Sequence, residues 1–416
     1  MKNLAIKLQN IKLDKLALFV FCAWIVLQII AVICYWNYPQ YPDVHHYMEE
    51  AISHLQRGEL YPSEIDLQDR WIQSPGNANY LLLILAIFGT FKPIMIINII
   101  MNAAIVVEMF YFAKTFFNKN TAYISIILYC GLLISNIFLP IHMLSEIPFL
   151  FLCMTALCLG LSSKWYWLLC SGFVFFLALT FRPQMAAFLV PLMLYYVLNK
   201  RQIKVYLLLL LPFALSIALF GEYNKNKTGY FLVNSTTGGQ CLAGVANDDA
   251  SLKGGEAEAF DLGGAAYIEN ELSKTFHEKD SIWKAMAVEW IKEHPVRYSI
   301  GVCVRACYLF VYDFWAFPLQ DHIKPELRTH EVTASRLNYV LLSIPFYILV
   351  LITLFSLWFN RRDILTKKGL VFLIIIFFVG GSSLVHVETR FHYPFVWALC
   401  IWAAYGIEKK FHTMKA

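Results

Sequence analysis

Long apolar segments alternate with short polar links along most of the chain. A helix that crosses about 30 Å of hydrocarbon needs roughly 20 mostly apolar residues, and the first apolar segment, residues 16–35, has that length. The pattern predicts an all-α polytopic membrane protein with about 10–12 transmembrane helices. The further predicted segments are residues 77–91, 93–113, 121–139, 145–161, 165–181, 184–198, 203–220, 298–315, 336–358, 369–385 and 391–407.

Two of these segments leave the number of spans open. Residues 77–91 are short for a full crossing, and residues 298–315 carry Arg305. If both segments span, the basic links in the first and last thirds of the chain would no longer lie on the cytoplasmic side, against the positive-inside rule. Each segment either crosses, lies along the interface or enters the membrane partway.

Two hydrophilic stretches divide the chain into five predicted regions. The regions are residues 1–36, an N-terminal tail with the first transmembrane helix; 37–76, a first periplasmic loop with amphipathic helices; 77–220, a transmembrane bundle; 221–297, a large periplasmic loop; and 298–416, the C-terminal transmembrane helices.

Composition and charge agree with this division. Hydrophobic residues make up 59% of the chain and charged residues 15%, whereas soluble domains carry about 25% charged residues. Lys and Arg gather in the short links, which are therefore expected on the cytoplasmic side. The net charge of +5 is explained by these anchors and indicates no nucleic-acid partner. We expect a multi-pass protein of a bacterial inner membrane, with both hydrophilic stretches in the periplasm.

The first loop begins with an amphipathic pattern. Asp43 is placed as a helix N-cap, Tyr47, Ala51 and Leu55 recur at spacings of four, and Gly58 is expected to end the helix. Such a helix is expected to lie in the interface plane. Asp43 then has two interpretations, a simple cap or a functional carboxylate that faces a cavity at the membrane surface.

The same loop carries a family pattern. It reads Asp43-x3-Tyr47-x3-Ala51-x3-Leu55-x2-Gly58-x2-Tyr61, followed by Ser74-Pro75-Gly76-x3-Tyr80. This resembles the first loop of the GT-C superfamily of membrane glycosyltransferases, above all the branch related to protein O-mannosyltransferases and lipid A aminoarabinose transferases. Ser74 and Asn77 depart from the pattern of many relatives. The resemblance implies a GT-C-like bundle and a catalytic aspartate in this loop, which by the match is Asp43.

Four further stretches resemble the same family and follow in the same order. His392 and Tyr393 are departures within the last of them. The stretches are Leu144–Phe149, Thr180–Gln184, Val233–Gly239 followed by Gly244 and Asn247, and Glu388–Pro394.

The resemblance implies a specific reaction at the outer face. It is the transfer of a sugar from a polyprenyl-phosphate donor to a lipid, glycan or protein acceptor, by direct displacement with inversion. Asp43, Glu146, Arg182 and Arg390 all fall at the predicted outer ends of spans, and ionisable residues near a bilayer are functional candidates. Asp43 is the expected general base on the acceptor hydroxyl.

The remaining roles follow from charge and hydrogen-bonding capacity. Arg390 is expected to bind the donor phosphate, and stabilising that leaving group is electrostatic catalysis. Glu146 has an alternative as a helix cap or ion-pair partner, and Arg182 has one as an interfacial anchor. The secondary phosphate ligands are His392, Tyr393 and Arg182, and the expected substrate-binding residues are Glu146, Tyr47, His46 and Asp69.

No metal or other cofactor is expected. The adjacent His45 and His46 beside Asp43 leave a divalent cation as the alternative. The sequence contains no P-loop or Rossmann fingerprint, so a nucleotide-sugar donor is disfavoured. The expected partners are a polyprenyl-phosphate-linked sugar, its acceptor and membrane lipids. The rival classes are a transporter or lipid-linked glycan flippase, a glycan polymerase or ligase, and a non-catalytic membrane subunit.

Overall fold

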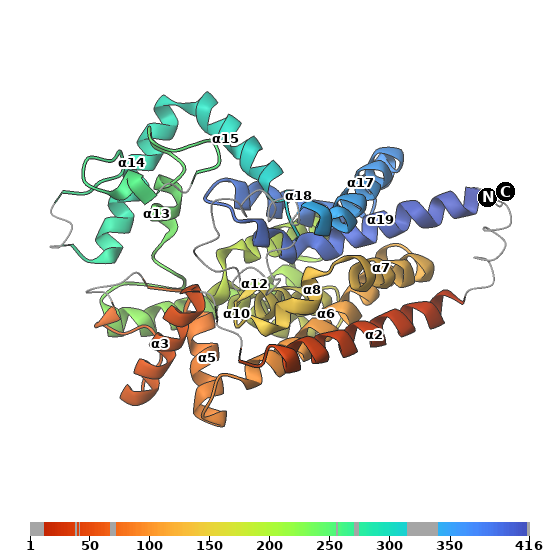
Figure 1. The fold of residues 1–416 in the computed structure, drawn as a ribbon, viewed down its shortest axis with the longest axis horizontal. Coiled ribbons are helices and arrows are strands. Elements are labelled where there is room, and N and C mark those ends of the chain that lie inside the picture. Colours follow the sequence, from red (N-terminus) through yellow and green to blue (C-terminus); the bar gives the residue numbers. More distant parts are fainter. Residues whose placement is uncertain are drawn as a thin grey trace.

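A computed structural model describes residues 12–37, 40, 42–66, 72–254, 257–269, 274–313 and 340–413. These residues form α-helices and short 3-10 helices and no β-strand (Figure 1). The elements in chain order are α2 (Leu13–Cys34), α3 (Pro42–Arg57), α5 (Pro75–Phe88), α6 (Pro93–Phe116), α7 (Lys119–Leu132), α8 (Ser135–Phe138), η1 (Leu139–Ile141), α9 (Glu146–Gly160), α10 (Trp165–Phe181), η2 (Pro183–Met185), α11 (Ala186–Leu198), α12 (Ile203–Thr228), α13 (Gly238–Ala243), η3 (Ala257–Phe260), α14 (Phe276–Glu293), α15 (Pro295–Tyr308), α17 (Ile344–Phe359), η7 (Arg361–Leu365), α18 (Gly369–Ser383), η8 (Thr389–His392) and α19 (Tyr393–Thr413).

The predicted helical membrane fold is confirmed. Among the described helices, α2, α6 and α12 are each long and apolar enough to cross a membrane, and a bent pair at residues 119–141 gives a fourth crossing if it counts as one span. Shorter apolar helices, among them α9, α10, α17 and α18, complete the bundle. The helices at the two ambiguous segments, α5 and α15, have 14 residues each. The total of 10–12 spans stays a prediction.

Helix α19 is the centre of the bundle. Residues 392–405 are all buried, including Trp397 and Trp402. A helix that is apolar on every side is stable only when other helices surround it, and α19 packs against α7, α17 and α18. The first turn of α19 and the preceding η8 are thereby held in one place at the end of the bundle.

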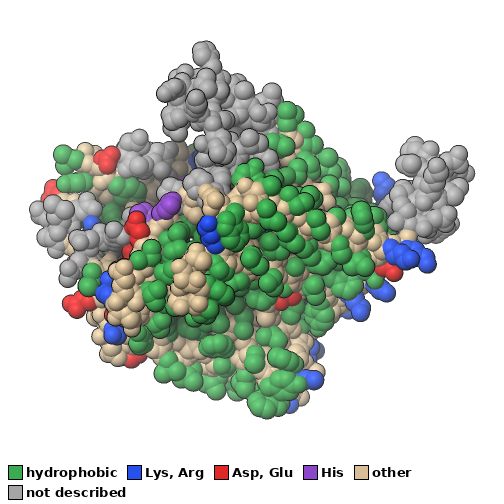
Figure 2. Space-filling view, turned by 60° about the horizontal axis from the view of Figure 1, so that its bottom comes forward, with side chains coloured by type: hydrophobic (Ala, Val, Ile, Leu, Met, Phe, Trp, Pro, Cys, Tyr) green, Lys and Arg blue, Asp and Glu red, His purple; other side chains and the backbone are tan. Residues whose placement is uncertain are grey.

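The outside of the bundle is suited to lipid. Along α12, Leu207, Leu211, Leu215 and Leu219 recur every four residues and are 59%, 66%, 55% and 65% exposed. Figure 2 shows a broad hydrophobic face, with Lys and Arg side chains mainly to its two sides. An exposed leucine stripe of this length in water would be an aggregation hazard, so the face is expected to contact lipid tails.

One predicted segment is wrong in shape. Residues 121–139 read as a single span, but α7 ends at Leu132 and the chain bends by 76° into residues 135–141. The side chain of Asn102 donates to the carbonyl of Asn136, 3.3 Å away, and to Gln28 Oε1, 3.0 Å away. Broken helices are tolerated at membrane depth where neighbouring side chains satisfy the freed backbone groups.

The amphipathic helix of the first loop is α3, with two corrections. It begins two residues earlier than an N-cap at Asp43 predicts, so Asp43 lies inside its first turn and is not the N-cap. Its inner face carries Ala51 and His54, both fully buried, whereas Leu55 is 39% exposed. The period of 3.6 residues explains the error, because position 54 stays on the inner face. The predicted end is confirmed: the helix stops before Gly58, which has φ +68°.

The glycine-rich segment of the second hydrophilic stretch opens α13. Asp280 of α14 accepts hydrogen bonds from the backbone N–H groups of Gly239, at 2.7 Å, and Gln240, at 3.0 Å. A Cβ added to Gly239 would lie 1.9 Å from the carbonyl oxygen of Asp280, whereas one added to Gly238 would meet nothing within 4 Å. The glycine at position 239 is therefore needed for the approach of α13 to α14.

Alanine substitutions at the two neighbouring glycines should have different effects. Gly239→Ala is expected to lower stability by about 1–3 kcal/mol, the usual cost of overpacking. Gly238→Ala, the matched control, should leave it unchanged or slightly raised, because alanine is a better helix former than glycine. Melting midpoints of the two purified variants test this. Equal midpoints would contradict the close packing.

Candidate functional site

Four chain regions bring charged side chains together at one end of the bundle. Asp43 comes from the first turn of α3, Glu146 is the first residue of α9, and Arg390 lies in η8. Arg182 lies between α10 and η2 with an extended backbone, the conformation favoured for a residue before proline. The four outer-end residues predicted from sequence are thus neighbours in space.

Arg390 is the centre of this cluster. Its Nη2 lies 2.7 Å from Asp43 Oδ2, and its Nε lies 2.5 Å from a carboxylate oxygen of Glu388 and 3.9 Å from one of Glu146. Burial lowers the pKa of Arg390, but these three carboxylates raise it by more than burial lowers it. The pKa therefore lies above its ordinary value, and the guanidinium stays charged. The Arg390 side chain is 13% exposed and that of Asp43 55%. Asp43 is therefore the solvent-facing partner.

Glu388 is the first residue of the motif Glu388–Pro394, but it was not predicted as a site residue. Burial raises its pKa, yet the neighbouring His386, 3.9 Å away, and the charge of Arg390 lower it to about 2. Its position two residues before Arg390 in the same motif is the signal that could have identified it.

Glu146 and Arg182 form a second, deeper pair. Arg182 donates from Nη2 to Glu146 at 2.6 Å and from Nε to the Ser145 hydroxyl at 2.8 Å. Glu146 is fully buried and Arg182 is 15% exposed. A buried carboxylate is costly unless it is paired, so the ion-pair alternative for Glu146 describes its geometry in this structure.

Tyr47 faces this cluster from α3. Burial raises its pKa, while the positive charge of Arg182 opposes the rise. The phenol therefore stays protonated at neutral pH and offers a hydrogen-bond donor next to Arg182 and Asp43.

His392 and Tyr393, both predicted as phosphate ligands, point away from the charged cluster into the core. His392 Nε2 lies 2.9 Å from Asp313, and the Tyr393 hydroxyl donates to Asn102 at 3.0 Å. Both side chains are almost fully buried. They anchor η8 and the start of α19, and so hold Arg390 in position. Asp313 was missed by sequence because it is 79 residues away from His392 and belongs to no motif.

Two further residues, His46 and Asp69, were predicted to bind substrate. His46 lies 3.9 Å from Glu49 on its own helix and has no place in the arginine cluster. Asp69 lies outside the described residues.

A metal-like group of ligands lies in the first loop, separate from Asp43. Ligand atoms of Glu50, His54 and Asp66 lie within 4.8 Å of one another. However, Arg57 Nη2 lies 2.7 Å from His54 Nε2 and 3.7 Å from Asp66. A guanidinium already supplies the positive charge that a metal would bring. These residues are therefore better explained as an ion-pair network that stabilises the first loop than as a metal site.

An apolar cavity of about 440 Å³ lies beside the charged cluster. It is lined by residues of α5, α9 and α10, including Pro148, Thr180 and Phe181, which are close in sequence to Glu146 and Arg182. A Cβ at Gly76 of α5 would lie 2.5 Å from Thr180 Oγ1. The glycine thus lets α5 approach the end of α10 closely, beside this cavity.

Comparisons with known proteins identify the fold. No protein-family model matches the sequence, and no curated protein matches it significantly. The archaeal oligosaccharyltransferase AglB of Archaeoglobus fulgidus, in complex with an inhibitory peptide and a dolichol-phosphate, has a similar structure, with a TM-score of 0.50 at 11% identity over 96% of this chain and 51% of that chain. The apo form of the A. fulgidus oligosaccharyltransferase gives a TM-score of 0.49 at 10% identity, with the same coverage.

The chain therefore spans about half the length of these proteins. At such low identity the similarity to AglB concerns the fold. This similarity in fold agrees with the GT-C-like helical bundle that the resemblance in sequence implied.

Proposed function

We propose that the protein is a membrane glycosyltransferase that uses a polyprenyl-phosphate-linked sugar. The observation that carries this proposal is the contact of Asp43 with Arg390, which joins residues 347 positions apart at the rim of the bundle. An inverting transfer from a lipid phosphate needs a base for the acceptor hydroxyl and a cation for the leaving phosphate, and Asp43 and Arg390 bring two such groups to one site.

The neighbouring cavity supports the lipid part of the donor. It is almost entirely apolar, and its lining includes Pro148 and Phe181, which lie two residues from Glu146 and one from Arg182 in the sequence. A polyprenyl chain in this cavity would place its phosphate at the charged rim, because the apolar and ionic ends of the donor would then each meet matching groups.

The proposed reaction begins with an exchange of partners. The donor phosphate replaces Asp43 on Arg390, and Arg182 adds a second positive charge. Asp43, now free, takes the proton of the acceptor hydroxyl. The acceptor oxygen forms a bond to the anomeric carbon as the bond from that carbon to the phosphate oxygen breaks. The electron pair leaves with the phosphate, and the configuration inverts. Tyr47 and Glu146 hydrogen-bond sugar hydroxyls.

The distribution of basic residues supports an outer-face site. At the end of the bundle where α19 stops, Lys368 and Lys409 meet Asp363, and Lys367 contacts the backbone of Thr115. Figure 1 shows this end opposite α13 and α14. By the positive-inside rule the lysine-rich end is cytoplasmic and the arginine cluster periplasmic. The acceptor in this proposal is a lipid, a glycan or a protein of the cell envelope.

A donor assay with the purified protein in lipid nanodiscs tests the proposal. Given polyprenyl-monophosphate sugars and a membrane glycan extract, it should transfer the sugar, and NMR of the product should show an inverted anomeric configuration. Transfer from diphosphate-linked glycans alone would indicate a polymerase or ligase. Glycan translocation in liposomes, without transfer from any monophosphate donor, would indicate a flippase. Each of these outcomes would overturn the proposal.

A further inference from the structure

Arg305 of α15 is a buried charge that the proposed reaction does not use. Its side chain is 1% exposed, and no carboxylate in the part of the chain that the structure describes pairs with it. Gly301, one turn earlier on the same face, leaves room for the guanidinium, because a Cβ there would lie 2.8 Å from Arg305 Nη1. A buried charge without an ionic partner is costly, so the contacts that replace such a partner indicate what the arginine does.

The first of these contacts is with the end of α18, against which α15 packs. Arg305 Nε donates to the carbonyl oxygen of Ser383, the last residue of α18, at 2.8 Å. Tyr298, about two turns earlier on α15, donates its hydroxyl to the next carbonyl, that of Leu384, at 2.6 Å. The guanidinium also lies over the Tyr298 ring, 5.5 Å from its centroid. The last carbonyls of a helix lack intrahelical partners and attract positive charge, so the two side chains together cap α18.

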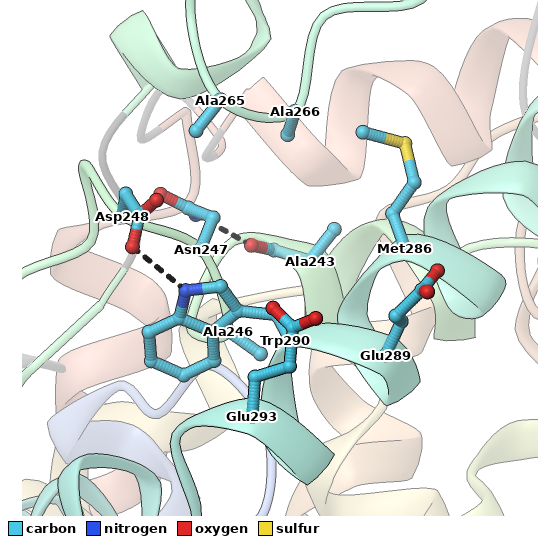
Figure 3. Close-up of a pocket in the computed structure, with 10 residues that line it drawn as sticks. All are labelled: Ala243, Ala246, Asn247, Asp248, Ala265, Ala266, Met286, Glu289, Trp290 and Glu293. Atoms are coloured by element: carbon cyan, nitrogen blue, oxygen red, sulfur yellow. Dashed lines mark hydrogen bonds between the residues drawn. The ribbon is translucent and has the colours of Figure 1, made fainter.

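The second contact joins the lobe formed by α13, η3 and α14. Arg305 Nη1 donates to the carbonyl oxygen of Leu252, which follows α13, at 3.2 Å. The chain just before Leu252 is itself held on the lobe. Asp248 accepts a hydrogen bond from Trp290 Nε1 of α14 at 2.9 Å, as Figure 3 shows. Arg305 is therefore a bridge between the outer lobe and the membrane bundle.

The chain between α18 and η8 is short and non-helical, yet it determines where Arg390 lies. Both of its ends are held by one stretch of chain, residues 298–313. Arg305 holds the start through the end of α18, and Asp313 holds the far end through His392, 2.9 Å away. Because the connection is short, a shift at its start would move the guanidinium of Arg390.

We propose that Arg305 is a positioning residue of the donor site. It fixes the course of the chain from Ser383 to Arg390 and ties that chain to the outer lobe. The proposal rests on the proposed function for its consequence, which is that Arg390 meets the donor phosphate in the place that transfer requires. A misplacement of about 1 Å can lower a rate on the order of 10²-fold. Arg305 acts through Arg390 and does not itself contact the donor.

Hydrogen exchange of the full-length protein in lipid nanodiscs tests the positioning without any donor, so it can fail independently of the proposed function. Arg305→Met keeps an unbranched side chain but removes its hydrogen bonds. The backbone amides of residues 383–392 should then exchange about tenfold faster, the scale of one lost hydrogen bond to a charged group. Arg305→Lys keeps the charge but cannot reach both carbonyls, so its exchange should be intermediate. If the methionine variant does not fold, the lysine variant decides.

The matched control is Arg297→Ala on the same helix. Arg297 donates to the carbonyls of Asp248 and Ala250, at 3.0 Å each, so its hydrogen bonds go to the lobe. This variant should speed exchange near residue 250 and leave residues 383–392 as in the wild type. Equal acceleration of residues 383–392 in Arg297→Ala, or wild-type exchange there in both Arg305 variants, would overturn the assignment.

Steady-state kinetics with a polyprenyl-phosphate sugar separate positioning from stability. Arg305→Met should raise the donor KM about tenfold and also lower kcat, because a displaced Arg390 binds the phosphate less well before and during transfer. A variant that is merely less stable would lower the apparent kcat and leave KM unchanged, and that result would contradict positioning. A wild type that does not use the donor would overturn the proposed function alone, and the exchange measurement would still decide the role of Arg305.

Discussion

Sugar transfer by the Asp43→Asn variant is expected to fall about 10²–10⁴-fold, the usual contribution of a general base. Asparagine has the same shape and can still accept the hydrogen bond that Arg390 donates to position 43. It cannot take a proton from the acceptor hydroxyl. The loss should therefore appear in kcat, and the KM for the donor should stay the same or fall, because the phosphate no longer has to displace a carboxylate from Arg390.

The matched control is Glu64→Gln. Glu64 is an exposed carboxylate of the same loop, so this variant removes the same charge without touching the arginine cluster, and its activity should equal that of the wild type. If Asp43→Asn retained activity within a few-fold of the wild type, Asp43 would not be the base. A loss that appeared only in the donor KM would mean that Asp43 merely positions Arg390.

Much of the fold could be predicted from the sequence because the bilayer imposes a single length scale on apolar segments. The predicted segment 165–181 has the same bounds as the observed helix α10. The bend inside the predicted span at 121–139 was not predicted, because the residues that support it lie elsewhere in the chain. The bend after Leu132 is supported by Asn102 of another helix. Hydropathy along one segment carries no information on such a contact.

The charged cluster was partly predictable for the same reason. Asp43, Glu146, Arg182 and Arg390 each stand at the end of an apolar run, and runs that end at the same interface bring their terminal residues to one level. The direction in which a side chain points was not predictable. His392 is two residues from Arg390 and turns inward to a distant aspartate that no local pattern identifies.

The Arg390→Ala variant should lose transfer activity about 10²–10³-fold, as expected when one preorganised donor to a developing anion is removed. The loss should include a higher donor KM, because the guanidinium is expected to bind the phosphate in the ground state as well. Arg390→Lys should fall between the wild type and Arg390→Ala, since lysine keeps the charge but not the planar fork that can contact two oxygens.

Arg361→Ala is the control for this series. Arg361 is an exposed arginine of η7, which lies between α17 and α18, and its removal should leave transfer unchanged. Assays between pH 6 and 8 avoid a confounding titration. The pKa of Glu388 is lowered from its ordinary 4.5 to about 2, so its stabilising pair with Arg390 is fully present above pH 4.5 and is lost only as the pH falls toward 2. Full activity in Arg390→Ala would remove the phosphate-binding assignment.

The double variant Asp43→Asn/Arg390→Ala distinguishes a shared reaction step from two independent contributions. If donor phosphate must displace Asp43 from Arg390 before the carboxylate can act as a base, the two residues are coupled, and the double variant should lose much less activity than the product of the two single losses. Independent roles would give the full product. Kinetics of the four proteins under one donor concentration series separate the two cases, and a strictly multiplicative loss would contradict the exchange of partners.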